Sequence, residues 1–117
     1  KIRNSVAQSY IDSFRDLKRL RLPLVRGEVY HSFHLFVVQC EERESLVSYL
    51  SAKGVETGIH YPVALPKQDA YKHLNSRQKC LNAESMDRHL LSLPIGEHMN
   101  NEKIRYVADA ICGFFDR

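Results

Sequence analysis

Hydrophobic residues recur at helical spacing near both ends of the chain. Near the N-terminus they are three or four residues apart and form one apolar stripe: Ile2, Val6, Tyr10, Phe14 and Leu17. Pro23 ends this pattern, because a proline cannot continue a helix interior. A second stripe predicts a final helix behind Asn100 or Asn101 as the N-cap: Ile104, Val107, Ala108, Ile111, Cys112 and Phe115. Both helices should bury one face.

The stretch between these helices alternates strand-like and helix-like patterns. Residues 33–38 are aromatic and branched without polar alternation, which predicts a strand covered on both faces. A helix is predicted over residues 43–53, with Gly54 as its C-terminal stop. Residues 55–59 and 90–94 predict two further strands.

Prolines bound a loop over residues 60–66, since each proline fixes its own φ and favours extended geometry before it. Short helices are predicted over residues 67–74 and 82–89. The resulting order is helix, strand, helix, strand, helices, strand, helix. It predicts an α/β fold, a small few-stranded sheet covered by helices. A chain of 117 residues suits one such domain.

The composition argues against several classes of protein. The apolar share is 44%, an ordinary globular value, and no run approaches the about 18 apolar residues of a membrane helix. Residues 1–4 read as the middle of a helix and contain no apolar signal region. Three widely spaced cysteines favour reduced thiols over a disulfide framework. We therefore expect a cytoplasmic protein without a membrane partner, in which Cys40 and Cys112 belong to the core.

Basic residues cluster over residues 15–26, although the net charge of the chain is only +3. This cluster can be a nucleic-acid patch. It can also be a solvated helix end, where cations complement the helix dipole. No base-stacking aromatic motif accompanies the charge, which favours the helix end and no nucleic-acid partner.

Two histidines, His31 and His34, stand three residues apart and raise the question of a metal site. On a strand, residues three apart point to opposite faces. No nearby cysteine or carboxylate completes a ligand set, so no metal site is expected. For His34, inside an apolar run, the default expectation is a buried, hydrogen-bonded side chain.

Residues 57–62, Thr-Gly-Ile-His-Tyr-Pro, resemble the TGIHYP signature of the DegT/StrS-type sugar aminotransferases, which have the fold of the aspartate aminotransferase superfamily. Further blocks of the chain resemble the family in the same order and spacing. They are a HLFVV strand, a helix and turn, a QxAY segment, an LSLP strand and the start of a final helix, at residues 33–38, 43–55, 68–71, 91–95 and 101–107. Together these blocks cover nearly the whole chain.

The resemblance implies an enzyme that moves an amino group, usually from glutamate, onto a keto group of a nucleotide-linked sugar. Its cofactor is pyridoxal 5'-phosphate (PLP). In the family the Schiff-base lysine, the aspartate facing the ring nitrogen and most phosphate contacts lie in a large N-terminal domain. The resemblance therefore implies that residues 1–117 are the C-terminal small domain, with the large domain upstream. It implies no catalytic residue in this chain, and a homodimeric full-length enzyme of polysaccharide or deoxysugar biosynthesis.

Within the signature, His60 and Tyr61 are expected to bind substrate on one wall of the cleft. They follow a predicted strand and precede a rigid proline, and each carries a polar tip on a planar body. A structural alternative is that Tyr61 packs under the loop and His60 satisfies a backbone carbonyl. His34 is a further candidate for substrate binding.

The chain departs from the family pattern at two loop positions. Ala64 replaces a proline, and Pro66 stands where a second histidine is expected. The sequence KQDAY at residues 67–71 favours a 3-aminotransferase-like enzyme acting on a deoxyhexose. The alternative is a non-catalytic α/β module that binds a sugar nucleotide or a protein partner. A small domain that normally packs on a large domain and on a dimer mate should expose an apolar patch when isolated, and the N-terminal helix stripe is a candidate.

Overall fold

A three-stranded antiparallel sheet forms the centre of the molecule. The computed structural model describes residues 1–74 and 80–116. The strands are β1 (Leu20–Arg21), β2 (Phe36–Cys40) and β3 (Leu90–Leu93), in the order β1-β2-β3. β2 is the central strand, and its residues 36–39 pair with β3 from Leu93 back to Leu90. The predicted few-stranded sheet with covering helices is confirmed.

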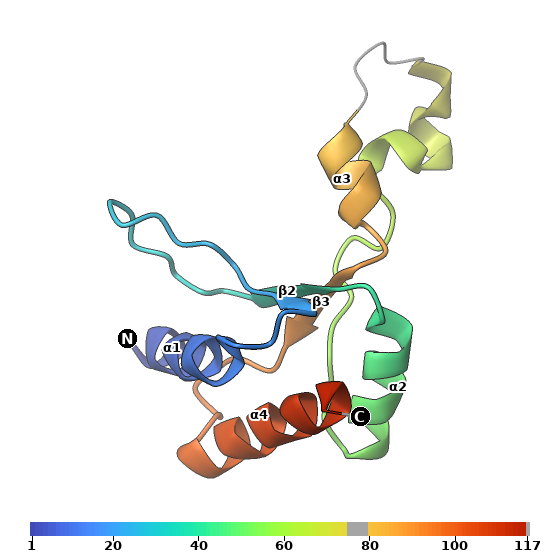
Figure 1. Ribbon diagram of the computed structural model, residues 1–117. Helices are drawn as coiled ribbons and strands as arrows, with labels where there is room; N and C mark the ends of the chain where they lie inside the picture. The colour runs from blue at the N-terminus through green and yellow to red at the C-terminus, as the bar shows by residue number, and fades with distance from the viewer. Residues whose placement is uncertain (75–79, 117) are drawn as a thin grey trace.

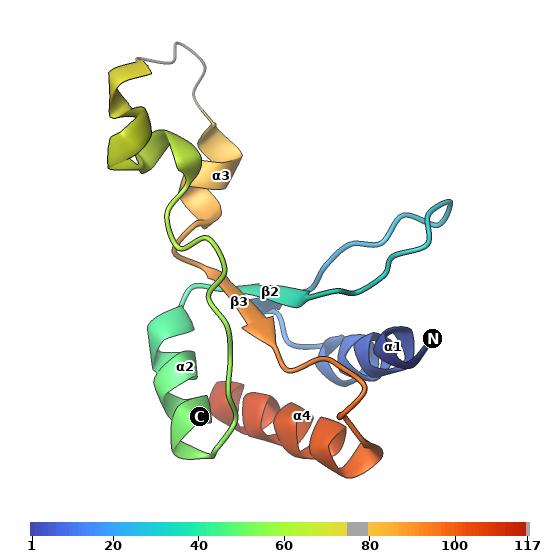
Figure 2. The same cartoon turned by 180° about the vertical axis from the view of Figure 1, so that it is seen from behind.

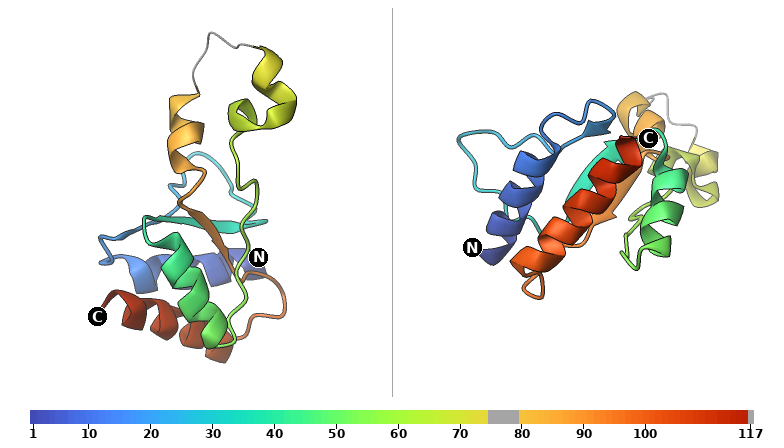
Figure 3. Two further views of the ribbon diagram at one scale, coloured as in Figure 1. Left: turned by 90° about the vertical axis from the view of Figure 1, so that its right-hand side faces the viewer. Right: turned by 60° about the horizontal axis from the view of Figure 1, so that its bottom comes forward.

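Three helices cover one face of this sheet. They are α1 (Ile2–Phe14), α2 (Arg43–Ala52) and α4 (Asn101–Phe115), and α4 lies between the other two (Figure 1; Figure 3, right). The sheet and the helices bury the large side chains of the core between them: Tyr10, Phe14, Phe36, Leu46, Leu50, Leu91 and Ile111. The ring centroids of Tyr10 and Phe36 are 5.2 Å apart. This burial holds the helices to the sheet.

The apolar stripe of α1 therefore faces the core. Val6, Tyr10 and Phe14 are buried, so the expected exposed patch on this helix is wrong. Exposed apolar side chains lie instead in connecting segments. Leu24 is 94% exposed and Tyr30 77% exposed, both in the long β1–β2 connection that extends away from the helices (Figure 1).

Capping residues set the ends of the long helices as the sequence predicts. The Asn100 side chain accepts a hydrogen bond from the Lys103 amide at 2.9 Å, so Asn100 rather than Asn101 is the N-cap of α4. After α2, Gly54 adopts a φ of 71°. This left-handed conformation is costly for other residues and ends the helix.

Strand β2 begins later than predicted and has two different faces. Phe33 has a positive φ of 47° and lies outside the strand, which starts at Phe36. Along β2, residues 36, 38 and 40 are buried and residues 37 and 39 are half-buried. The expectation of a strand covered on both faces therefore holds only in part, because the three packed helices lie on one side of the sheet (Figure 2).

The basic segment begins at Arg15, the C-cap of α1, and continues beyond the helix, so the helix-end interpretation holds only for its start. α1 ends at Phe14, and Leu20 and Arg21 form the short strand β1, which the sequence pattern did not predict. Arg15 pairs with Asp12, and Arg19 pairs with Glu42. Part of the basic cluster is thus paired with nearby carboxylates.

The segment after α2 is more irregular than the sequence predicts. Residues 55–59 form a single antiparallel bridge, Gly58 with Ser92, instead of a strand. The predicted helix over 67–74 is two 3-10 helices, η1 (Leu65–Lys67) and η2 (Asp69–Leu74). The α-helix α3 spans Leu81–Met86 and is shorter than expected. The elements η1, η2 and α3 project away from the three packed helices (Figure 3, left). In the described parts of the chain, no helix has the length and apolar character to span a membrane.

Candidate functional site

The start of the loop that carries His60 and Tyr61 is attached to strand β3. Gly58 donates to the Ser92 carbonyl at 2.9 Å, and Ser92 donates back to the Gly58 carbonyl at 2.8 Å. Two residues later, His60 Nδ1 lies 2.9 Å from Ser92 Oγ. Ser92 is buried, so this side chain gives the imidazole a fixed partner. The alternative in which His60 satisfies a backbone carbonyl is wrong for Nδ1.

Gly58 makes this arrangement sterically possible. A Cβ at this position would lie 2.8 Å from His60 Cε1 and 3.3 Å from His60 Nδ1. The imidazole therefore folds back over a site that only hydrogen occupies. Because Ser92 holds Nδ1, Nε2 is the ring nitrogen left for another partner, and none contacts it among residues 1–74 and 80–116.

Tyr61 is the most exposed part of the loop. Its φ is 55°, in the left-handed region that non-glycine residues rarely adopt. The side chain is 86% exposed, so the alternative in which Tyr61 packs under the loop is wrong. A left-handed residue between His60 and Pro62 turns the chain sharply. The turn holds a large, amphipathic ring in the solvent beside His60.

The far end of the loop has a second attachment. Asp87 Oδ2 accepts hydrogen bonds from the Ala64 amide at 3.2 Å and from Lys67 Nζ at 2.9 Å. The Lys67 hydrogen bond and then the Ala64 amide lower the pKa of the Asp87 carboxyl below its usual value. Neither Asp87 nor Ser92 was predicted as a site residue. Both lie in or just before the LSLP strand, and only the fold brings them to the loop.

His34 belongs to a different part of the structure. It is exposed and precedes β2, so the expectation of a buried strand histidine is wrong. Its carbonyl accepts a hydrogen bond from Arg3 Nη1 at 2.7 Å. No hydrogen bond joins His34 to His60 or Tyr61 within the described residues. His60 and Tyr61 are thus neighbours on the loop, and His34 stands on the segment before β2.

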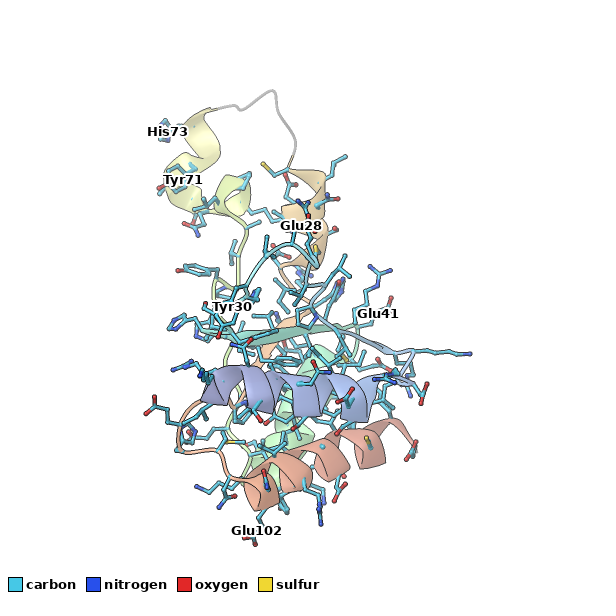
Figure 4. The ribbon with its side chains drawn as sticks, turned by 90° about the vertical axis from the view of Figure 1, so that its left-hand side faces the viewer. Glu28, Tyr30, Glu41, Tyr71, His73 and Glu102 are labelled. Carbon is cyan, nitrogen blue, oxygen red and sulfur yellow. The ribbon has the colours of Figure 1, made fainter. Side chains whose placement is uncertain are left out.

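The other histidine of the pair, His31, takes part in a local turn. Its Nδ1 accepts a hydrogen bond from the Phe33 amide at 2.9 Å. In the part of the chain that the structure describes, no three histidine, cysteine or acidic side chains are grouped as metal ligands. Tyr71 and His73 project from η2, at the end of the molecule far from α1 and α4 (Figure 4).

Two of the cysteines are held in the protonated form. Cys40 is buried and Cys112 is half-buried against the core. Burial raises the pKa of both thiols. The core position is confirmed for Cys40 and holds in part for Cys112. Neither thiol has the environment of a reactive nucleophile.

A cavity of about 730 Å³ lies between the end of α2 and the start of α4. Its polar lining includes Glu56, His98 and Lys103, and neither His60 nor Tyr61 contributes to it. The two motif residues therefore stand on an open surface. An exposed, well-anchored loop of this kind can form one wall of a cleft whose other wall comes from elsewhere.

Comparisons with known proteins identify the family of the chain. The model of the DegT/DnrJ/EryC1/StrS aminotransferase family matches residues 1–112. The dTDP-3-amino-3,4,6-trideoxy-alpha-D-glucose transaminase of Streptomyces venezuelae is 34% identical over 116 residues, which cover 98% of this chain and 31% of that protein. The dTDP-3-amino-3,6-dideoxy-alpha-D-galactopyranose transaminase of Aneurinibacillus thermoaerophilus is 32% identical over 109 residues, or 93% of this chain and 30% of that protein.

A solved structure gives the same result for the fold. S. venezuelae DesV, determined in complex with a ketimine intermediate, superposes with a TM-score of 0.90 at 31% identity. The match covers 99% of this chain and 32% of DesV. The chain thus spans about a third of the length of the relatives it matches. On the matched residues and the shared fold, the chain belongs to the DegT/DnrJ/EryC1/StrS aminotransferase family.

Proposed function

We propose that this chain is the C-terminal small domain of a PLP-dependent transaminase that aminates a keto nucleotide-sugar. The observation that carries the proposal is the attached loop, which presents His60 and Tyr61 side by side on an open surface. The two transaminases compared above are both named for dTDP-linked 3-amino sugars. We therefore favour a 3-amino-deoxyhexose product, in polysaccharide or deoxysugar biosynthesis.

In this proposal, the chain contributes recognition and no catalytic residue. His60 Nε2 and the Tyr61 hydroxyl can each donate or accept a hydrogen bond, as recognition of sugar hydroxyl and phosphate oxygens requires. The large domain upstream supplies the lysine and the binding site for PLP. When bound, the cofactor provides the electron sink that transfer of an amino group between two carbon atoms needs. Glutamate is the amino donor we propose.

The surface of the chain supports a larger assembly. The β1–β2 connection holds several apolar side chains in solvent, among them Leu24 and Tyr30, although Phe33 is buried in the core. Hydrogen bonds from α1 also reach this connection. Arg3 donates to the His34 carbonyl, and Asn4 Nδ2 donates to the Tyr30 hydroxyl at 3.2 Å. An ordered, apolar and exposed connection is suited to a docking role. We propose that the large domain or the mate of a cytoplasmic homodimer covers it.

The full-length product of the reading frame tests this function. We would purify it, look for the yellow absorbance of lysine-bound PLP, fix the cofactor with borohydride and map the labelled lysine. Glutamate-dependent amination of a dTDP-linked 3-keto-6-deoxyhexose is the expected activity. A labelled lysine outside this chain, together with that activity, supports the proposal. A colourless product without activity overturns it and favours a module that binds a sugar nucleotide without a cofactor.

A further inference from the structure

Asp87 is a buried carboxylate on which two structural elements converge. Its side chain is only 5% exposed, and buried carboxylates normally require partners. Oδ2 accepts hydrogen bonds from the Ala64 amide and from Lys67 Nζ. On the main-chain side, the Asp87 carbonyl accepts from Arg43 Nη1 at 2.9 Å. Asp87 therefore links the first residue of α2 to the substrate loop.

Arg43 fixes the backbone of Asp87 in place. The Arg43 side chain is buried, and its Nε and Nη2 donate to Glu44 at 3.0 and 2.6 Å. Because α2 packs its buried leucines on the core, the guanidinium is held by the helical layer. The position of Asp87 thus follows from the core, and the Asp87 side chain transmits that position to Ala64 and Lys67.

The loop is attached at both ends, and a short span lies between. Ser92 holds it at Gly58 and His60, and Asp87 holds it at Ala64 and Lys67. Residues 61–63 lie between these attachments, and the Val63 carbonyl accepts a further hydrogen bond from Gln68 Nε2 at 3.3 Å. Since Pro62 has a fixed φ, few torsions remain free in this span. The orientation of Tyr61 relative to His60 therefore depends on both attachments.

The hydrogen bonding of Asp87 favours a role in loop conformation over one in stability. Lys67 is 38% exposed and also donates to the Glu84 carbonyl at 2.6 Å. Asp87 Oδ1 is buried and has no hydrogen-bond partner among residues 1–74 and 80–116. A buried ionic contact that leaves an acceptor unsatisfied is costly. Such a contact can still select one conformation of the chain around it.

We propose that Asp87 is a positioning residue for substrate recognition, because it holds Ala64 and Lys67 and thereby fixes the orientation of His60 and Tyr61 toward the nucleotide sugar. This inference rests on the proposed function. Asp87 itself stands behind the loop and makes its contribution through the two loop residues.

The test uses the full-length enzyme and measures its two half-reactions separately. Asp87→Ala removes both loop hydrogen bonds, and Asp87→Asn keeps an acceptor for the Ala64 amide but loses the charge. In Asp87→Ala we expect KM for the nucleotide sugar to rise about tenfold or more, as for a misplaced binding group. Asp87→Asn should lie between Asp87→Ala and the wild type. The glutamate half-reaction, followed by cofactor absorbance, should stay within about twofold because a remote contact leaves it unaltered.

Matched controls and a second readout keep the outcomes distinct. Asp109→Asn and Asp109→Ala change an exposed carboxylate on α4 and should leave both half-reactions unchanged. Amide hydrogen exchange should show faster exchange over residues 61–67 in Asp87→Ala and unchanged exchange in β3. If Asp87→Ala does not fold, Lys67→Met removes the same ion pair from the exposed side.

Three results decide the matter. An unchanged KM for the sugar and unchanged exchange of the loop overturn the positioning role. An equal loss in both half-reactions overturns it too, since that reflects general destabilisation. A wild-type enzyme without transaminase activity contradicts the proposed function instead, and loop exchange then still tests whether Asp87 orders the loop.

Discussion

The hydrogen bond between His60 Nδ1 and Ser92 Oγ joins the signature loop to the central sheet. It connects residues 32 positions apart in sequence, and Ser92 itself is fixed by the pairing of β2 with β3. The orientation of the exposed imidazole is thus set by a buried strand. The loop therefore has a conformation before any substrate arrives, which lowers the entropic cost of binding.

Replacement of Ser92 by alanine should show how much this hydrogen bond contributes to stability and how much to substrate binding. The variant keeps the backbone bridge to Gly58 and loses only the hydroxyl. We expect a destabilisation of about 1 kcal/mol, because a typical intramolecular hydrogen bond contributes that much. KM for the nucleotide sugar should rise with little change in the glutamate half-reaction. Ser45→Ala, at an exposed position on α2, serves as the control in both measurements. A normal KM in Ser92→Ala would show that the ring needs no partner.

Gly58→Ala should produce the same functional defect by a different route. The added methyl would lie 2.8 Å from His60 Cε1, so the ring must move and the contact with Ser92 is lost. In a double-mutant cycle with Ser92→Ala, the two effects on KM should be strongly non-additive. Gly113→Ala on α4 is the control, since a Cβ there meets only the Tyr49 hydroxyl at 3.7 Å, an ordinary contact. Additive effects would mean that Gly58 acts independently of the imidazole.

Tyr61 should show opposite effects on stability and on binding. A tyrosine with a φ of 55° is strained, and glycine or asparagine tolerates that conformation better. Tyr61→Gly and Tyr61→Asn should therefore leave the free energy of unfolding of the enzyme unchanged or raise it by up to about 1 kcal/mol. Both should weaken binding of the nucleotide sugar. Tyr61→Phe should show how much of that affinity comes from the hydroxyl group. Parallel losses of stability and affinity would argue against a strained, ligand-facing tyrosine.

The Asp87–Lys67 pair should make a pH-dependent contribution to stability. The folded-state pKa of Asp87 lies below its unfolded value, so above about pH 4 the ionised side chain stabilises the fold relative to the protonated one, although its burial is costly. This stabilisation is lost as the pH falls through the folded pKa. The difference in Tm between the wild type and Asp87→Asn should therefore be largest near neutral pH and shrink in acid. A difference that does not vary with pH would contradict an ionised Asp87.

The parts of the fold with strong periodicity were predictable from sequence. The stripe of α1, the capped helix α4, the Gly54 stop and strand β3 all follow from local patterns whose tertiary partners agree with them. Segments without such periodicity were not predictable. β1 is two residues long, and η1 is attached through Lys67 to Asp87, which is distant in sequence. Phe33 has a positive φ that no local pattern indicates.

The candidate site shows the same division. His60 and Tyr61 were predicted as site residues because a contiguous motif carries them. His34 was expected in a strand because it stands in a run of apolar residues, but β2 begins only at Phe36. Ser92 and Asp87 had no sequence signal of their own. Each becomes recognisable only when the fold brings it against the loop, as a buried polar side chain with hydrogen bonds to another segment.

The two attachments of the loop also separate residues that can be substituted from residues that must be kept. Residues 61–63 lie between fixed points and do not belong to the core cluster, so their side chains can change without disturbing the helices or the sheet. In such an enzyme, substitution of three neighbouring residues can change the sugar that is bound while the core stays the same. For protein engineering, this short span is therefore a natural place to diversify a library, with Gly58, Ser92 and Asp87 kept constant.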